Sequence, residues 1–118
     1  MVETIDARRA HDMLDQGEVV LLDVMPRESY ERLHIPKAVN VPYFHDRFDE
    51  RAQHKLPEKD AKVIVYASEA KDEEGAKAAK RLESLGFPHV YHLSDGLQAW
   101  REEGYTFSGG GLEREPRM

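Results

Sequence analysis

The side chains best suited to chemistry follow a short apolar run, Val63–Tyr66, which is typical of a buried strand. The polar stretch after it holds four carboxylates, one ammonium group and one hydroxyl group, from Glu69, Asp72, Glu73, Glu74, Lys71 and Ser68. A carboxylate could act there as a base or a nucleophile if burial or a like charge raises its pKa. The net negative charge of the stretch should repel anions such as phosphate. A helix is predicted from about Glu73 to Leu85, so acids in its first turn also favour the helix dipole, by about 0.3–1 kcal/mol each.

Strand-type and helix-type segments alternate along the rest of the chain. Strands are predicted at 4–5, 19–24, 39–42, 63–66 and 89–93, and helices at 7–16, 27–33, within 43–56, 73–85 and 97–104. This order predicts a single α/β domain with a mainly parallel sheet of four or five strands and helices on both faces. Ligands in such sheets bind beyond the carboxyl ends of the strands. The stretch after Tyr66 is therefore the first place to expect a site.

Local signals define several boundaries. Asp6 is a good N-cap for the helix that follows, and Gly17 suits the left-handed position after its end. In the segment 43–56, Phe44, Phe48 and Ala52 recur at four-residue spacing, which predicts one apolar face of a loose helix. The domain should span residues 1–107. The Gly-rich residues 108–118 have little to bury and are predicted to form a flexible tail.

Composition narrows the class of protein. The 118 residues suit one domain, 40% hydrophobic and 34% charged, with a formal net charge of -6 that argues against nucleic acid or an anionic membrane as partner. The chain has no cysteine, so thiolate chemistry and cysteine metal sites are excluded. No apolar run is long enough to span a membrane, and the N-terminus lacks a secretory signal. A cytoplasmic location is the expectation.

Two histidines give only weak evidence for a metal-binding site. His45 and His54 flank a predicted helix that also holds Asp46 and Asp49, but no ligand spacing is convincing, and a solvated face is the simpler interpretation. Neither a metal nor another cofactor is predicted.

Three segments, in order, resemble the rhodanese family. Leu22–Tyr30 and His34–Pro42 resemble its signature, in which Asp-Val-Arg leads to Glu-Tyr, then Gly-His-Ile-Pro-Gly-Ala, then Asn-Ile-Pro. Val63–Tyr66, with the helix ending at Leu85–Phe87, looks like the family's strand, active-site loop and helix. Leu93–Trp100 is similar to its closing Leu-x-Gly-Gly-x-x-x-Trp element. The resemblance covers about residues 4–107 and implies the rhodanese fold.

The sequence departs from the family pattern at the catalytic position and at several motif residues. In active rhodaneses a cysteine follows the Tyr66 position and carries sulfur as a persulfide, whereas this chain has Ala67. Met25 stands where the family has an arginine. Glycines of the motifs are replaced at Leu33, Lys37 and Asp95. The resemblance implies that Asp23 organises hydrogen bonds beside the loop, that His34 is a structural histidine, and that Arg27 could stand in for the missing arginine.

These observations predict a rhodanese-like domain that does not work as a sulfurtransferase. The leading hypothesis is a binding or regulatory module that recognises a protein partner or small ligand at the loop after Tyr66. That loop comprises Ala67, Ser68, Glu69, Ala70, Lys71, Asp72, Glu73 and Glu74, supported by Asp23, Arg27 and His34. The alternatives are a hydrolytic or other enzyme that uses Glu69 or Asp72, and a sulfurtransferase-related protein whose partner supplies the thiol. Self-association through the tail or through Tyr43–Leu56 is a further alternative.

Overall fold

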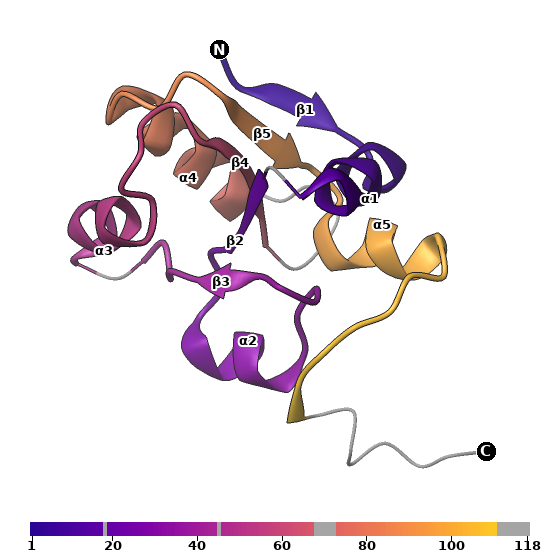
Figure 1. The fold of residues 1–118 in the computed structure, drawn as a ribbon. Helices are drawn as coiled ribbons and strands as arrows, with labels where there is room; N and C mark the ends of the chain where they lie inside the picture. The colour runs from indigo at the N-terminus through magenta and orange to yellow at the C-terminus, as the bar shows by residue number, and fades with distance from the viewer. Residues whose placement is uncertain (18, 45, 68–72, 111–118) are drawn as a thin grey trace.

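The computed structural model describes residues 1–17, 19–44, 46–67 and 73–110 (Figure 1). Its strands are β1 (Glu3–Ile5), β2 (Val19–Asp23), β3 (Val39–Asn40), β4 (Lys62–Tyr66) and β5 (Val90–Leu93). Its helices are α1 (Ala7–Gln16), α2 (Arg27–Arg32), α3 (Phe48–Lys55), α4 (Glu73–Ser84) and α5 (Gly96–Glu102). The predicted alternation of strands and helices is confirmed, with boundaries that shift by a few residues.

The five strands form one sheet in the order β1-β5-β4-β2-β3, and every pair is parallel. Helices α1 and α5 pack together on one side of the sheet, while α3 and α4 pack together on the other (Figure 1). The predicted parallel α/β architecture is confirmed. Because the strands are parallel, the carboxyl ends of β2, β3 and β4 meet at one edge.

Local chemistry explains the boundaries of α1. The Asp6 carboxylate accepts a hydrogen bond from the Arg9 amide at 2.8 Å, which satisfies one of the free N–H groups of the first turn. Gly17 has a φ of 80°, and its N–H donates to the Leu14 carbonyl. A side chain at that φ would be strained, so glycine ends the helix there.

The core is centred on β4. Its residues 63–66 are fully buried, as a strand covered on both faces must be. On α4 the buried positions are Ala78, Ala79 and Leu82, together with Gly75. Small residues on this face allow the helix to lie close to the sheet.

The predicted helix within 43–56 begins later than expected. Phe48 and Ala52 are buried on α3, but Phe44 precedes the helix and is 70% exposed, so the proposed apolar face is wrong at that residue. The Tyr43 amide donates to the Val24 carbonyl at 3.0 Å. This bond ties the segment to the end of β2 before the helix starts, and the four-residue spacing of Phe44 does not reflect a shared helical face.

A tight turn with an unusual backbone conformation follows α2. In the turn Ile35–Ala38 the Ala38 amide donates to the Ile35 carbonyl at 3.1 Å, and Lys37 has a φ of 74°. Proline at the second position and positive φ at the third fit a type II turn, in which the third residue is commonly glycine. This conformation accounts for the glycine that the family motif has in place of Lys37.

Residues just after the predicted domain boundary contact the body of the protein. His34 and Ser108 form an antiparallel bridge with N–O distances of 2.8 and 2.9 Å. Gly109 has a φ of 134°, and a Cβ there would lie 2.5 Å from the Arg32 carbonyl oxygen. The division into a domain and a flexible tail stays a prediction, and residues 111–118 of that tail lie outside the described residues. None of the helices within the described ranges has the length and apolarity to cross a membrane.

Candidate functional site

The candidate site lies where β2 and β4 end side by side. Asp23, the last residue of β2, pairs in register with Tyr66, the last residue of β4. The Val24 amide donates to the Tyr66 carbonyl at 3.1 Å, which extends the pairing one residue further. The next residue after β4 is Ala67, so the first residue of the predicted recognition loop leaves the sheet beside Asp23 and Val24.

The Asp23 carboxylate is fully buried, and its oxygens are occupied by hydrogen bonds. Oδ1 accepts from the Met25 amide at 2.9 Å and more weakly from the Asn40 side-chain amide at 3.4 Å. Oδ2 accepts from the Tyr66 hydroxyl at 2.7 Å. The same hydroxyl accepts from the Ile35 amide at 3.0 Å. The network therefore joins β2, β4 and the segment before β3.

Burial dominates the acid–base behaviour of this network. Desolvation raises the pKa of Asp23 to about 6, although the hydrogen bonds from Tyr66 and Met25 lower it. Burial, together with the neighbouring Asp23 charge, also raises the pKa of Tyr66. Tyr66 thus stays protonated and donates. With hydrogen bonds to both oxygens, the buried Asp23 carboxylate orders the backbone that leads into the loop.

Sequence reasoning did not single out the Tyr66 hydroxyl or Asn40 as part of the site. A tyrosine at the end of a buried strand needs a hydrogen-bond partner for its hydroxyl, which was an available signal. The Asn40 amide donates to the Asp23 and Met25 carbonyls at 3.1 and 2.9 Å. These bonds hold the β2–α2 turn against β3.

Two of the predicted supporting residues lie on or just after α2 and make local contacts. His34 is half-buried; its Nδ1 lies 2.6 Å from the Tyr30 carbonyl oxygen, and its ring stacks on Tyr30 with centroids 3.9 Å apart. Arg27 is exposed, and its Nε is 2.8 Å from Glu31 Oε1. Arg27 therefore serves as one half of a surface ion pair.

The predicted loop is described only at its two ends. Ala67 is 2% exposed, and Met25, which stands at the family's arginine position, is 3% exposed. Glu73 is exposed and Glu74 half-buried in the first turn of α4. Ser68, Glu69, Ala70, Lys71 and Asp72 lie outside the described residues. At the first end of the loop, the side chains of Ala67 and Met25 are therefore buried in the core. At the other end, two carboxylates begin α4.

No group of three or more His, Asp or Glu side chains converges on a metal-sized site anywhere in the described ranges. Asp46 and His54 are exposed, and His45 lies outside the described residues.

The rhodanese-like domain model matches residues 6–103 of this chain. The chain belongs to the rhodanese-like domain family. The solution NMR structure of the rhodanese-like domain of the Anabaena sp. Alr3790 protein is 32% identical. It aligns over 100% of this chain and 87% of that domain, with a TM-score of 0.85.

Curated relatives of this rhodanese-like chain differ in length. Thiosulfate sulfurtransferase GlpE of Coxiella burnetii is 26% identical over 102 residues, which cover 86% of this chain and 89% of GlpE. The adenylyltransferase and sulfurtransferase UBA4 of Candida albicans is 33% identical over 90 residues. These cover 71% of this chain but 20% of UBA4. The chain thus spans only a fifth of UBA4.

Proposed function

We propose that this rhodanese-like domain is a binding or regulatory module that does not itself carry sulfur. The observation that carries the proposal is the complete absence of cysteine from the chain. Sulfur transfer by a persulfide needs a thiolate that attacks a sulfane sulfur and then holds it. The resemblance places that thiolate at Ala67, whose methyl group cannot form a sulfur bond.

The surroundings of Ala67 support this proposal. The Met25 side chain offers no positive charge, and Arg27 is paired with Glu31 instead of standing in for the missing arginine. Glu73 and Glu74 add negative charge at the start of α4, where an anionic sulfur donor would need positive charge. An acidic recognition loop suits a protein partner or small ligand that carries positive charge.

Some relatives support a modular role. The matched segment makes up 20% of UBA4 and 38% of the HTH-type transcriptional regulator Rv0324 of Mycobacterium tuberculosis. In those proteins a segment similar to this chain is one part of a longer polypeptide. A rhodanese-like fold can persist in such a setting because its core does not depend on the loop.

Sulfur transfer is tested with thiosulfate as donor and cyanide as acceptor, by measuring thiocyanate. The wild-type chain should stay at the background rate, and activity there would refute the proposal. Ala67→Cys should also stay at background, because a thiol buried like the Ala67 methyl group has a raised pKa. Activity in Ala67→Cys would show that the loop can still bind an anionic sulfur donor and would favour an anionic ligand.

Binding at the loop is tested by quantitative affinity purification. The loop variant carries Glu69→Gln, Asp72→Asn, Glu73→Gln and Glu74→Gln. A matched control carries Glu50→Gln, Glu58→Gln, Asp12→Asn and Asp60→Asn, four acids elsewhere in the chain with the same change in charge. A specific partner should be retained by the wild type and the control and depleted on the loop variant. Equal capture by the loop variant would contradict recognition through this loop.

A further inference from the structure

A second surface lies between the segment that leads into α3 and the side of α4. An open cavity of about 380 Å³ there, the Phe44 pocket, is lined by Tyr43, Phe44, Asp46, Phe48, Asp49 and Arg81. Its volume falls at the lower end of the range for ligand pockets, roughly 300–1,000 Å³. The lining includes none of the predicted loop residues that the structure describes.

Aromatic rings form the apolar part of the Phe44 pocket. Phe48 is buried, and Tyr43 packs edge-to-face on it with ring centroids 5.2 Å apart. Phe44 also packs edge-to-face with Tyr43, with centroids 5.3 Å apart, yet is 70% exposed. Among the described residues, only Phe44 and the terminal Met1 are large hydrophobic side chains that stand exposed. The Phe44 ring is therefore accessible at the mouth of the pocket.

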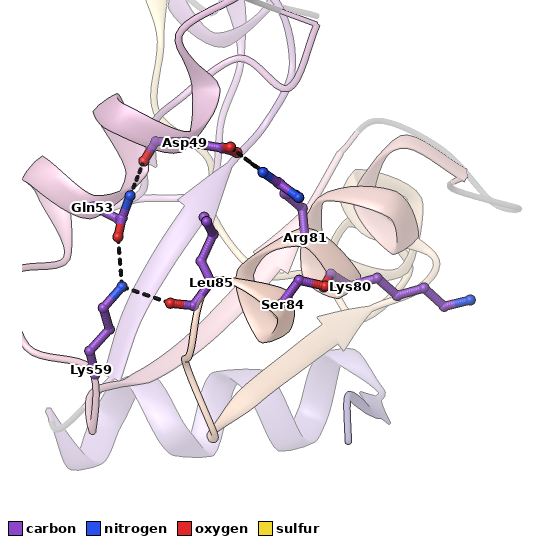
Figure 2. A network of polar contacts seen from close by, with 7 residues as sticks. All are labelled: Asp49, Gln53, Lys59, Lys80, Arg81, Ser84 and Leu85. Carbon is purple, nitrogen blue, oxygen red and sulfur yellow. Dashed lines mark hydrogen bonds and ion pairs between the residues drawn. The ribbon is translucent and has the colours of Figure 1, made fainter.

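The charged part of the Phe44 pocket has one carboxylate without a counter-charge. Arg81 donates from Nε to Asp49 Oδ1 at 2.9 Å and from Nη2 to Oδ2, so these two charges offset one another (Figure 2). The exposed Asp46 side chain makes no hydrogen bond or ion pair with any other residue that the structure describes. One formal negative charge therefore remains beside the exposed Phe44 ring.

The wall of the pocket is held by contacts between α3 and α4. Lys59 donates to the Gln53 side chain at 2.8 Å and to the Leu85 carbonyl at 2.9 Å (Figure 2). Gln53 in turn donates to the Asp49 carbonyl at 3.1 Å (Figure 2). Together with the Asp49–Arg81 pair, these contacts link α3 to α4 and to the residues that follow each helix.

We propose that the Phe44 pocket docks a segment of a partner protein that presents a lysine or arginine next to an apolar side chain. The cation lies against the Phe44 ring and pairs with Asp46, while the apolar neighbour covers the exposed aromatic edge. The net charge of -6 over the whole chain favours the approach of a basic segment to this protein.

Other ligand chemistries fit the pocket less well. An anion would meet the Asp46 carboxylate, and the guanidinium of Arg81 is already engaged by Asp49. A neutral apolar ligand would bury Asp46 without a partner, which is costly. A basic side chain pairs with the Asp46 carboxylate, and its apolar neighbour covers the exposed Phe44 ring.

A heptapeptide library displayed on phage and selected on the full chain tests this proposal, because the selection itself reveals which side chains bind. Selection should enrich peptides with lysine or arginine beside an apolar residue. The best peptide, labelled with fluorescein, is then titrated by fluorescence anisotropy. Phe44→Ala/Asp46→Asn should bind it about tenfold more weakly, because both contacts at the pocket are lost. Both residues are exposed, so the variant should fold normally, and Asp60→Asn serves as the matched control.

Several results would overturn the proposed docking at the Phe44 pocket. One is a set of selected peptides that share no basic residue, and another is a selection that enriches no peptide. A third is a Phe44→Ala/Asp46→Asn variant that binds the best peptide as tightly as the wild type does. Replacing the basic residue of the peptide by a neutral isostere should weaken binding by a similar factor, and unchanged affinity would exclude the cation contact. Light scattering that shows a wild-type dimer and a monomeric Phe44→Ala variant would assign the pocket to a second copy of this chain and refute the proposal.

Discussion

Removing one buried hydroxyl group tests the network at the end of β2 and β4. In Tyr66→Phe, the carboxylate of Asp23 loses the donor 2.7 Å from its Oδ2. The Ile35 amide loses its acceptor at 3.0 Å. Asp23 and Ile35 are fully buried, so water does not replace either bond. Phenylalanine keeps the ring, and the packing of the core is otherwise unchanged.

The expected loss follows from these two bonds. A hydrogen bond to a charged group contributes about 1.5–3 kcal/mol, and an unsatisfied buried amide costs about 1–3 kcal/mol. Because the two bonds share one hydroxyl group, their effects are not additive, and we expect the free energy of unfolding to fall by about 3 kcal/mol. This is a large part of the stability of a small domain, about 5–15 kcal/mol.

Urea denaturation at pH 7.5, where Asp23 is ionised, measures this loss. Tyr91→Phe is the matched control, because the half-buried Tyr91 hydroxyl makes no hydrogen bond with the rest of the described chain. The control should change the free energy of unfolding by less than about 0.5 kcal/mol. If Tyr66→Phe were as stable as Tyr91→Phe, the network would not contribute as described.

Three further predictions concern Asp23 and the chain segments next to α2. Since burial raises the pKa of Asp23 from 3.8 to about 6, the folded state binds its proton more tightly than the unfolded state between these pH values. Urea titrations from pH 4 to 7 should therefore show the stability of the wild type falling relative to Asp23→Asn as pH rises, by about 2 kcal/mol. A constant difference would contradict the raised pKa. Lys37→Gly should raise the free energy of unfolding by about 1 kcal/mol, because glycine relieves the positive φ, and a decrease would refute that strain. Gly109→Ala should lower it by about 1 kcal/mol or more and speed hydrogen exchange of the His34 amide, because the new Cβ meets the Arg32 carbonyl; unchanged exchange would argue against this contact.

Sequence-based prediction was accurate where one short segment contains all the relevant chemistry. The bounds of α1 were correct because Asp6 and Gly17 provide both caps locally. The start of α3 was wrong because the Tyr43 amide donates to the carbonyl of Val24, the residue just after β2. Spacing along the chain at Phe44 could not reveal a bond made across the sheet.

The sequence by itself determined that this chain has no thiolate, that strands and helices alternate, and that the stretch after Tyr66 is acidic. Only the tertiary structure decided which side chains meet. Asp23 and Tyr66 are 43 positions apart, and Asp49 and Arg81 are 32 apart. Each pair is brought together by the parallel order of the sheet and the helices that cover it. Buried polar groups need partners wherever the chain supplies them, and packing across the sheet decides which partners lie within reach.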